Sequence, residues 1–347
     1  MQHNGGARGL RILIVTDAWK PQVNGVVRTL EHLAGELASL GHEVRFATPE
    51  NQWTLPLPTY PEIRLALFPR SSLLKTIEEF EPDAIHIATE GPLGLSVRSI
   101  CRRRDIRFTT SFHTRFPQYV HTRFPVVPEN AVYAALRRFH RPSAATMVAT
   151  ASLKRDLESH GFSNLVLWSR GVDVNWFSPS RRSDLADFYP GSPRPFFLYV
   201  GRIAVEKNVE AFLRLDLPGT KLIVGEGPQR ARLQARFPEA RFLGQKTGAD
   251  LPGIYASSDV FVFPSRTDTF GLVLLEALAC GTPVAAYPVS GPLDVLGSGG
   301  GAVLSDDLRQ ACLEALSIPR DLCRHFAEIH SWRASAEQFI GNLSFAG

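Results

Sequence analysis

Apolar and polar positions along the chain follow two alternating patterns, which predict strands and helices in turn. Short continuous apolar runs such as residues 11–16 (RILIVT) and 196–200 (FFLYV) are typical of strands buried on both faces of a parallel sheet. Residues 26–40 instead place apolar side chains at helical spacing, and Gly41 ends that pattern. The alternation predicts an α/β protein. Further strands are predicted over 42–48, 84–88, 108–112, 147–150, 165–168, 221–224, 241–243, 259–264 and 283–287, and further helices over 152–159, 305–316 and 321–343.

Two stretches interrupt this alternation. Residues 49–61 are rich in proline and predict an irregular loop at the carboxyl edge of the sheet. Residues 177–195 replace the apolar periodicity with proline, serine and charge, which is typical of a linker. We therefore predict a first domain over residues 1–176 and a second over residues 196–330, and the length of 347 residues accommodates both.

The clearest candidate chemistry lies in residues 263–283 (FPSRTDTFGLVLLEALACGTP), which predict a strand end, a polar turn and a helix. Within the helix, Glu276 is surrounded by apolar residues on nearly every side. A buried carboxylate has to be paired or hydrogen-bonded, because leaving it unpaired costs several kcal/mol. Glu276 is therefore either a structural carboxylate that braces a neighbouring loop or a ligand for a pair of hydroxyl groups.

The turn before this helix contains a second acid. Asp268 can cap the helix together with Thr267 or Thr269, or it can bind a ligand. The peptide N–H groups of residues 270–272, which are Phe270, Gly271 and Leu272, are predicted at the helix N-terminus, where unpaired N–H groups form an anion site. A hydroxyl-binding acid, an acidic turn and an anion site together favour a nucleotide-sugar ligand.

Four further residues follow predicted strands or precede helices. Arg202 and Lys207 come directly after the strand 196–200, where both can reach one diphosphate, although two solvated surface cations are the alternative. Gly25 precedes the first helix, where a missing Cβ lets a phosphate approach the backbone, or it is a simple turn glycine. His113 ends the strand 108–112 and has either a structural or a catalytic role.

Composition narrows the class of protein. No apolar run approaches the length of about 18 residues that a membrane span needs, and the N-terminal residues lack the apolar core of a signal peptide, so we expect a cytoplasmic protein. Four cysteines without metal-ligand spacing predict reduced thiols and no metal site. The first strand-to-helix turn lacks the G-x-G-x-x-G pattern, which argues against a redox dinucleotide.

The net charge of +4 is modest, but its distribution is uneven. Residues 98–141 hold ten arginines against two acids, which suggests binding to phosphates or to an anionic membrane surface, with a solvated basic face as the alternative. Nucleic acid is disfavoured, because no nucleic-acid motif is present and the aromatic residues do not interleave with the cations as a stacking platform. Apolar residues of the stretch that could insert at a membrane interface are Phe116, Tyr119, Phe124, Val126, Val127 and Tyr133.

The spacing of Asp268 and Glu276 resembles the acidic-x7-Glu signature of family 4 retaining glycosyltransferases, although the first position of that signature is usually Glu. The run TSFHTRFPQYV around His113 resembles the lipid-directed, glycolipid-synthesising branch of the family. The resemblance spans residues 11–343. It implies the GT-B fold, in which two Rossmann-like domains face each other across a cleft and a last helix, here within residues 331–347, crosses back to the first domain.

The resemblance implies transfer of a hexose from a UDP- or GDP-sugar to an acceptor hydroxyl, with retention at the anomeric carbon and without a metal or other cofactor. The expected acceptor is a diacylglycerol-type lipid at the inner face of the membrane. A soluble acceptor, or a non-catalytic anion- or nucleic-acid-binding protein, is the alternative. The implied catalytic residues are His113, Arg202, Lys207 and Asp268, and the implied donor-binding residues are Gly25, Arg202, Lys207, Asp268, Phe270, Gly271, Leu272 and Glu276.

Overall fold

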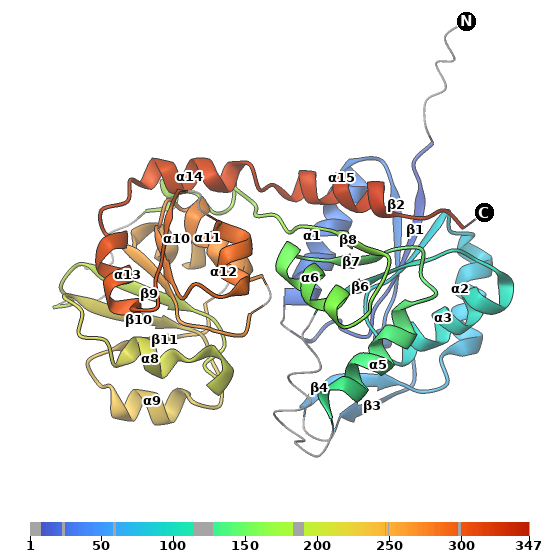
Figure 1. Cartoon of the computed structure of the whole chain (residues 1–347), viewed down its shortest axis with the longest axis horizontal. Coiled ribbons are helices and arrows are strands. Elements are labelled where there is room, and N and C mark those ends of the chain that lie inside the picture. The colour runs from blue at the N-terminus through green and yellow to red at the C-terminus, as the bar shows by residue number, and fades with distance from the viewer. Residues whose placement is uncertain are drawn as a thin grey trace, which may run out of the picture. The chain divides into compact units, whose positions relative to one another are not determined.

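The chain forms two compact units in the computed structural model. Unit 1 comprises Met1–Ser169 and Trp332–Gly347, and unit 2 comprises Arg170–Ser331 (Figure 1). The residues that the structure describes are 8–22, 25–57, 60–113, 128–182, 191–246, 248, 250–268, 270–297 and 300–346.

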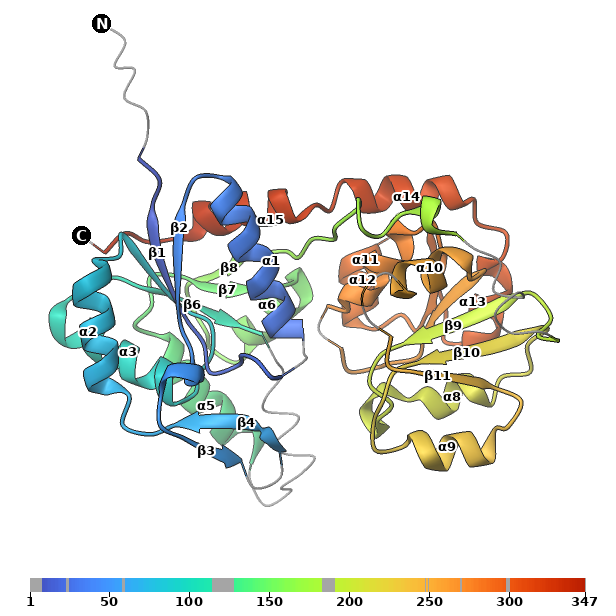
Figure 2. The same cartoon turned by 180° about the vertical axis from the view of Figure 1, so that it is seen from behind.

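Unit 1 is built on a six-stranded parallel sheet in the order β2-β1-β5-β6-β7-β8. Its first strand is buried on both faces, because Leu13 and Val15 pack in a core with α2 and α3, while Ile12 and Ile14 pack in a core with α1 and α15 (Figure 2). This two-sided burial explains the continuous apolar run. The strands are β1 (Arg11–Val15), β2 (Glu43–Ala47), β5 (Ala84–Ile87), β6 (Thr109–Phe112), β7 (Thr146–Val148) and β8 (Leu165–Leu167), and the helices are α1 (Gly25–Ser39), α2 (Arg70–Phe80), α3 (Pro92–Arg104), α5 (Glu129–His140), α6 (Ala151–Ser159) and α15 (Trp332–Asn342).

Unit 2 repeats this design with a second six-stranded parallel sheet in the order β11-β10-β9-β12-β13-β14. Phe196 and Leu198 of its central strand pack in a core with α10, α11 and α14, and Phe197 and Tyr199 pack in a core with α8 and α13. The strands are β9 (Phe196–Val200), β10 (Thr220–Val224), β11 (Arg241–Gly244), β12 (Val260–Phe263), β13 (Val284–Ala286) and β14 (Ala302–Leu304), and the helices are α8 (Val209–Leu213), α9 (Arg230–Arg236), α10 (Asp250–Ser257), α11 (Leu272–Ala279), α12 (Ser290–Leu296), α13 (Leu308–Ala315) and α14 (Arg320–Glu328).

The last helix, α15, belongs to unit 1 although it follows unit 2 in the sequence. The fully buried indole of Trp168 donates a hydrogen bond to Ser335 Oγ (3.1 Å) and packs against Phe339 (ring centroids 4.9 Å apart). Trp332 stacks on His32 of α1 (4.8 Å). The helix therefore completes the core of the N-terminal sheet.

The division between the units falls earlier than the position 176 expected from composition. Val172 forms a parallel bridge with Ser331, and Phe177 packs against the core of unit 2. The short 3-10 helix η2 (Pro179–Arg181), inside the predicted linker 177–195, contacts α10 of the same unit. Residues 183–190 of that linker lie outside the described residues.

Two predicted elements are wrong. Residues 49–61 are not an irregular loop, because the 3-10 helix η1 (Pro49–Asn51) is followed by an antiparallel hairpin of β3 (Thr54–Leu57) and β4 (Tyr60–Ala66). A two-stranded sheet consists only of edges, so proline is tolerated there. The single helix predicted over 321–343 breaks between α14 and α15, where the carbonyl of His330 accepts a hydrogen bond from Val172 N (2.9 Å).

Candidate active site

The carboxyl ends of β9 and β12 lie side by side in the sheet of unit 2, and the predicted site residues of this unit follow them. Arg202 and Lys207 lie in the loop after β9, the latter at the end of the 3-10 helix η3 (Val205–Lys207). Asp268 lies in the turn after β12 and before α11. Ligands of parallel α/β sheets bind at this edge.

Lys207 and Asp268 form an ion pair between Nζ and Oδ1, with side chains that are 24% and 17% exposed. Hydrogen bonds on both sides of the pair fix the two segments to each other. Asn208 Nδ2 donates to the carbonyl of Pro264 (3.1 Å), and Thr267 Oγ1 donates to the carbonyl of Glu206 (3.3 Å). The structure thus brings together two predicted site residues that are far apart in the sequence.

The second carboxylate oxygen of Asp268 faces a different situation. Oδ2 is buried, and none of the described residues donates a hydrogen bond to it. A buried acceptor without a donor is costly, so this oxygen is suited to accept a hydrogen bond from a ligand hydroxyl.

Tyr199, at the end of β9, holds the backbone of Arg202, because its hydroxyl donates a hydrogen bond to the carbonyl of Arg202 (2.8 Å). Burial, followed by the charges of Asp268 and Glu206, raises the pKa of Tyr199. Tyr199 therefore anchors the backbone of Arg202, whose side chain is exposed.

The N-terminus of α11 is left open by its capping residue. Gly271 is the N-cap, with φ of +83°, and no side chain among the described residues caps the first turn. The left-handed φ favours glycine, and a Cβ at this position would lie 3.1 Å from Phe263 Cζ and 3.2 Å from Leu274 Cδ1, so these side chains would have to shift slightly to admit it. Of the two roles open to Asp268, the described contacts do not show the capping one, because Oδ1 accepts from Lys207 and Oδ2 has no donor among the described residues. Thr269 lies outside the described residues. The N–H groups of Phe270, Gly271 and Leu272 stand at a helix N-terminus that favours anions.

Glu276 lies in α11 and is buried, with 7% of its surface exposed. Its Oε2 accepts a hydrogen bond from the hydroxyl of Tyr255 (3.0 Å), which lies in α10 and is completely buried. Burial, followed by the charge of Glu276, raises the pKa of the Cys280 thiol to about 12. The predicted burial of this carboxylate is confirmed, and Tyr255 is one partner of the kind that such burial demands.

Two predicted residues lie in unit 1, at the carboxyl edge of its sheet. Gly25 is the first residue of α1, and its neighbour Asn24 lies outside the described residues. His113 directly follows β6, and its ring lies edge-on to the indole of Trp168 (centroids 5.9 Å apart). Because both follow the parallel strands of one sheet, they share an edge where a ligand can bind.

Comparison with known proteins connects these observations. Residues 23–176 match the model of Glycosyltransferase Family 4, and residues 194–317 match that of Glycosyl transferases group 1. A GDP-mannose-dependent alpha-mannosyltransferase of Mycobacterium tuberculosis is 31% identical over 308 residues, which are 83% of this chain and 82% of that protein. The chain belongs to glycosyltransferase family 4.

Other relatives of this glycosyltransferase support the same family. An alpha-monoglucosyldiacylglycerol synthase of Streptococcus pneumoniae is 27% identical over 370 residues, covering 95% of this chain and 83% of that protein. The crystal structure of HepE from Anabaena, in complex with UDP and glucose, matches with a TM-score of 0.71 and 16% identity, covering 96% of this chain and 98% of that one. The likeness shows the fold, and the predicted GT-B class is confirmed.

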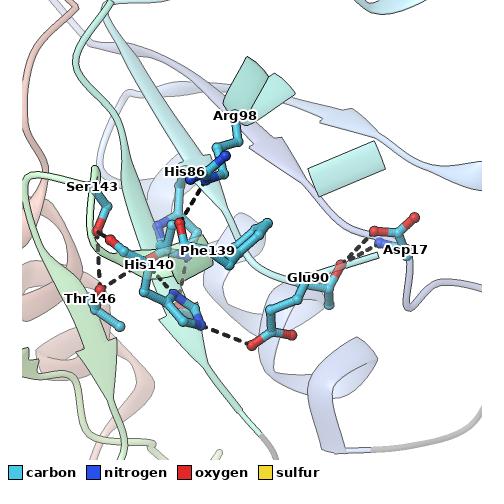
Figure 3. Close-up of polar contacts among 11 residues, drawn as sticks. Asp17, His86, Glu90, Arg98, Phe139, His140, Ser143 and Thr146 are labelled. Carbon is cyan, nitrogen blue, oxygen red and sulfur yellow. Dashed lines mark hydrogen bonds and ion pairs between the residues drawn. The ribbon is translucent and has the colours of Figure 1, made fainter. Parts of the chain in front are cut away.

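In this glycosyltransferase two buried histidines make hydrogen bonds with the hydroxyl side chains of β6, the strand that precedes His113. Buried His86 forms hydrogen bonds with Thr109 Oγ1 through Nδ1 and with Ser111 Oγ through Nε2 (both 2.9 Å). Buried His140 contacts Thr110 Oγ1 through Nδ1 (2.9 Å) and Glu90 Oε1 through Nε2 (3.2 Å) (Figure 3). Sequence reasoning missed both histidines, although three consecutive hydroxyl residues in a buried strand signal that polar partners are near.

Most of the described arginines of the basic stretch 98–141 lie near the C-terminal ends of α3 and α5. Arg98 of α3 donates to the carbonyl oxygens of Phe139 (Nε, 2.8 Å) and Arg138 (Nη2, 2.8 Å) at the end of α5 (Figure 3). Burial, followed by the charges of Arg102 and Arg138, lowers the pKa of Arg98. The two hydrogen bonds of Arg98 connect α3 to the end of α5.

Other parts of this stretch differ from the sequence-based expectation. Tyr133 is only 3% exposed and stacks on His160 (3.7 Å), so the prediction that it inserts at a membrane interface is wrong. Arg104 is paired with Glu78 (2.6 Å). The apolar candidates Phe116, Tyr119, Phe124, Val126 and Val127 lie outside the described residues.

The described residues contain no group of three or more His, Cys, Asp or Glu side chains that could hold a metal ion. All four cysteines are free and buried, and burial raises the pKa of each thiol to about 12. None of the helices in the described part of the chain is long and apolar enough to cross a bilayer.

Proposed function

We propose that this glycosyltransferase moves a hexose from a UDP- or GDP-sugar to a hydroxyl of a diacylglycerol-type membrane lipid, with retention at the anomeric carbon. The observation that carries the proposal is the Lys207–Asp268 pair at the carboxyl edge of β9 and β12, with the open N-terminus of α11 following in the chain. The relatives named as GDP-mannose-dependent and as a glucosyldiacylglycerol synthase support the donor and acceptor classes.

Catalysis is proposed to come from stabilisation of the leaving diphosphate. In the transition state positive charge develops on the sugar and negative charge on the diphosphate, so fixed donors aimed at the phosphates lower the barrier. We assign this role to Arg202, Lys207 and the N–H groups of residues 270–272. The backbone at Gly25 is proposed to bind phosphate as well. The leaving phosphate can itself accept the acceptor proton, so no covalent nucleophile is required.

The remaining assignments concern the donor sugar and the nucleoside. Asp268 Oδ2 is proposed to accept a hydrogen bond from a sugar hydroxyl, because it is a buried oxygen without a described donor. His113 is proposed to contact the same sugar. Glu276 is proposed to bind the ribose hydroxyls. Because Arg202 and Lys207 neutralise the diphosphate, no metal ion and no other cofactor are needed in this proposal.

A transfer assay tests the proposed reaction. The protein is incubated with diacylglycerol in mixed micelles and with a panel of UDP- and GDP-hexoses, in the presence of EDTA. We expect one donor to give a glycolipid whose new linkage has the anomeric configuration of the donor, at an unchanged rate when magnesium replaces EDTA. An inverted product would exclude the retaining reaction. Turnover that is lost in EDTA and restored by magnesium or manganese would show that the side chains of Arg202 and Lys207 do not take the place of a metal ion.

The acceptor class also requires a membrane surface, and we propose the basic face formed by α3 and α5 within residues 98–141, at the inner side of the membrane. Arg102 and Arg103 in the last turn of α3 are exposed, as are Arg137 and Arg138 near the end of α5. Each cation near an anionic leaflet contributes roughly 1 kcal/mol, so several together give useful and salt-sensitive association.

Vesicle flotation checks this surface. We expect the protein to float with phosphatidylglycerol vesicles at low salt and to be released at about 0.5 M salt, where the Debye length is only about 4 Å. Neutral phosphatidylcholine vesicles serve as the control. Equal recovery with both vesicle types, or with neither, would favour a soluble acceptor.

A further inference from the structure

A small cavity opens in unit 1 between the C-terminal end of α5 and the loop that connects α6 to β8. Its volume is about 160 Å³. Arg137, His140 and Arg141 line one side, and residues 161–164 line the other. The volume is about five times the ~30 Å³ that a water molecule occupies in the liquid, which suits one tetrahedral anion better than a whole nucleotide-sugar.

The charge of this cavity has one sign. Arg137 and Arg141 are four residues apart, so both side chains lie on one face of the helix end. The lining contains no aspartate or glutamate. Within the described part of the chain, the Arg141 side chain makes no hydrogen bond or ion pair, and it is exposed. Arginines at a helix C-terminus also interact favourably with the helix dipole, but that role requires no cavity.

The wall that faces these arginines is fixed. Arg137 Nη1 donates to the carbonyl of His160 (2.7 Å), so one edge of the guanidinium is held. Gly161 has φ of +78°, and a Cβ there would lie only 3.1 Å from Arg137 Nη1, so the glycine makes room for the guanidinium. A guanidinium held in this way loses little further freedom when it binds a ligand.

The floor of the cavity is equally constrained. Asn164, in the left-handed region at φ of +56°, donates from Nδ2 to the carbonyl of Ser143 (2.7 Å). Ser143 Oγ donates to the carbonyl of His140 (2.8 Å), and the His140 ring is held between Thr110 and Glu90 (Figure 3). Asn164, Ser143 and His140 therefore already have hydrogen-bond partners within unit 1, whereas Arg137 and Arg141 are exposed.

We propose that Arg137 and Arg141 form a binding site for one phosphate group. Planar guanidinium groups bind phosphate oxygens through paired, charge-assisted hydrogen bonds, and two of them balance the charge of a phosphate monoester. The phosphate is either that of an acidic phospholipid headgroup or a free phosphate. The phosphate site is argued from the cavity alone and does not depend on the proposed membrane surface. It becomes part of that surface only if the bound phosphate belongs to a lipid.

The test uses the full chain and inorganic phosphate as the probe. Phosphate is titrated by calorimetry into wild-type protein and into the Arg141→Gln variant, at an ionic strength held constant with chloride. The Arg141 side chain makes no hydrogen bond or ion pair with the described residues and is exposed, so we expect the variant to fold, which thermal unfolding verifies. We expect the variant to bind phosphate at least about tenfold more weakly, as a lost charge-assisted contact of 1.5–3 kcal/mol implies.

The matched control is Arg103→Gln, which removes the same charge from the end of α3, outside the cavity, and should leave phosphate affinity unchanged. Equal phosphate binding by wild type and Arg141→Gln, or no binding to wild type at millimolar phosphate, would overturn the site. Flotation with phosphatidylglycerol vesicles then separates the sources. If Arg141→Gln loses more vesicle binding than Arg103→Gln, and free phosphate competes, the ligand is a lipid headgroup. If both variants lose vesicle binding equally while only Arg141→Gln loses phosphate binding, the ligand is a free phosphate.

Discussion

Replacing Lys207 with alanine is expected to lower kcat by roughly 10²- to 10³-fold, as the loss of a single preorganised donor to a developing negative charge does in other enzymes. The ammonium group is proposed to stabilise the leaving diphosphate, whose charge grows on the way to the transition state. Its loss should therefore affect kcat far more than the KM for the donor. The measurement is initial-rate kinetics with the donor identified by the transfer assay.

The structure adds a second reason for the size of this effect. Lys207 is paired with Asp268, so the alanine variant also leaves a largely buried carboxylate without its cation. Lys207→Arg separates the two contributions, because it keeps the charge and should recover part of kcat. Lys75→Ala is the control, since Lys75 is an exposed lysine paired with Glu79 in unit 1. A folded Lys207→Ala protein with wild-type kcat would falsify the assignment.

Replacing Glu276 with glutamine is expected to raise the KM for the donor by about 10- to 100-fold while leaving kcat nearly unchanged. Hydrogen bonds to a charged group contribute about 1.5–3 kcal/mol, and bonds to ribose hydroxyls are made equally in the ground and transition states. Glutamine has the same shape, and its carbonyl oxygen can still accept from Tyr255, so the fold should survive. Donor KM and thermal unfolding are measured together.

Tyr255→Phe is the companion variant that decides between the two roles of Glu276. It removes the hydroxyl that reaches Oε2 and should reduce the free energy of unfolding by about 1–3 kcal/mol, because a buried carboxylate loses a donor. If Glu276 binds ribose, the two variants diverge, with Glu276→Gln affecting mainly KM and Tyr255→Phe mainly stability. If both only lower stability and donor KM stays at the wild-type value, Glu276 is a bracing carboxylate and the ribose assignment fails.

Most of the fold could be predicted because its signals are local. Strands such as β9 are buried on both faces, so their apolar runs identify them without knowledge of their neighbours. The hairpin of β3 and β4 was missed because proline argues against strands, except at edges. The break between α14 and α15 was missed because it depends on the pairing of Val172 with Ser331, which no local pattern reveals.

The candidate site shows the same limit. The burial of Glu276 could be predicted from the apolar residues around it, but its partner Tyr255 lies on a separate helix and carries no distinguishing neighbours in the sequence. The pairing of Lys207 with Asp268 joins the ends of β9 and β12, so it follows from strand order rather than from spacing. Strand order is a property of the whole sheet, and the residue pattern of a single segment does not reveal it.

The return of α15 to unit 1 has a consequence for biosynthesis. Trp168 is buried in part by Ala336 and Phe339, which are translated only after the whole of unit 2. Unit 2 is one unbroken segment and is complete once Ser331 has left the ribosome, whereas unit 1 at that moment still lacks one wall of its core. Domains usually finish folding in the order of their synthesis. In this chain unit 1 begins before unit 2 but is completed after it, so its apolar sheet face stays open to chaperones until α15 has been translated.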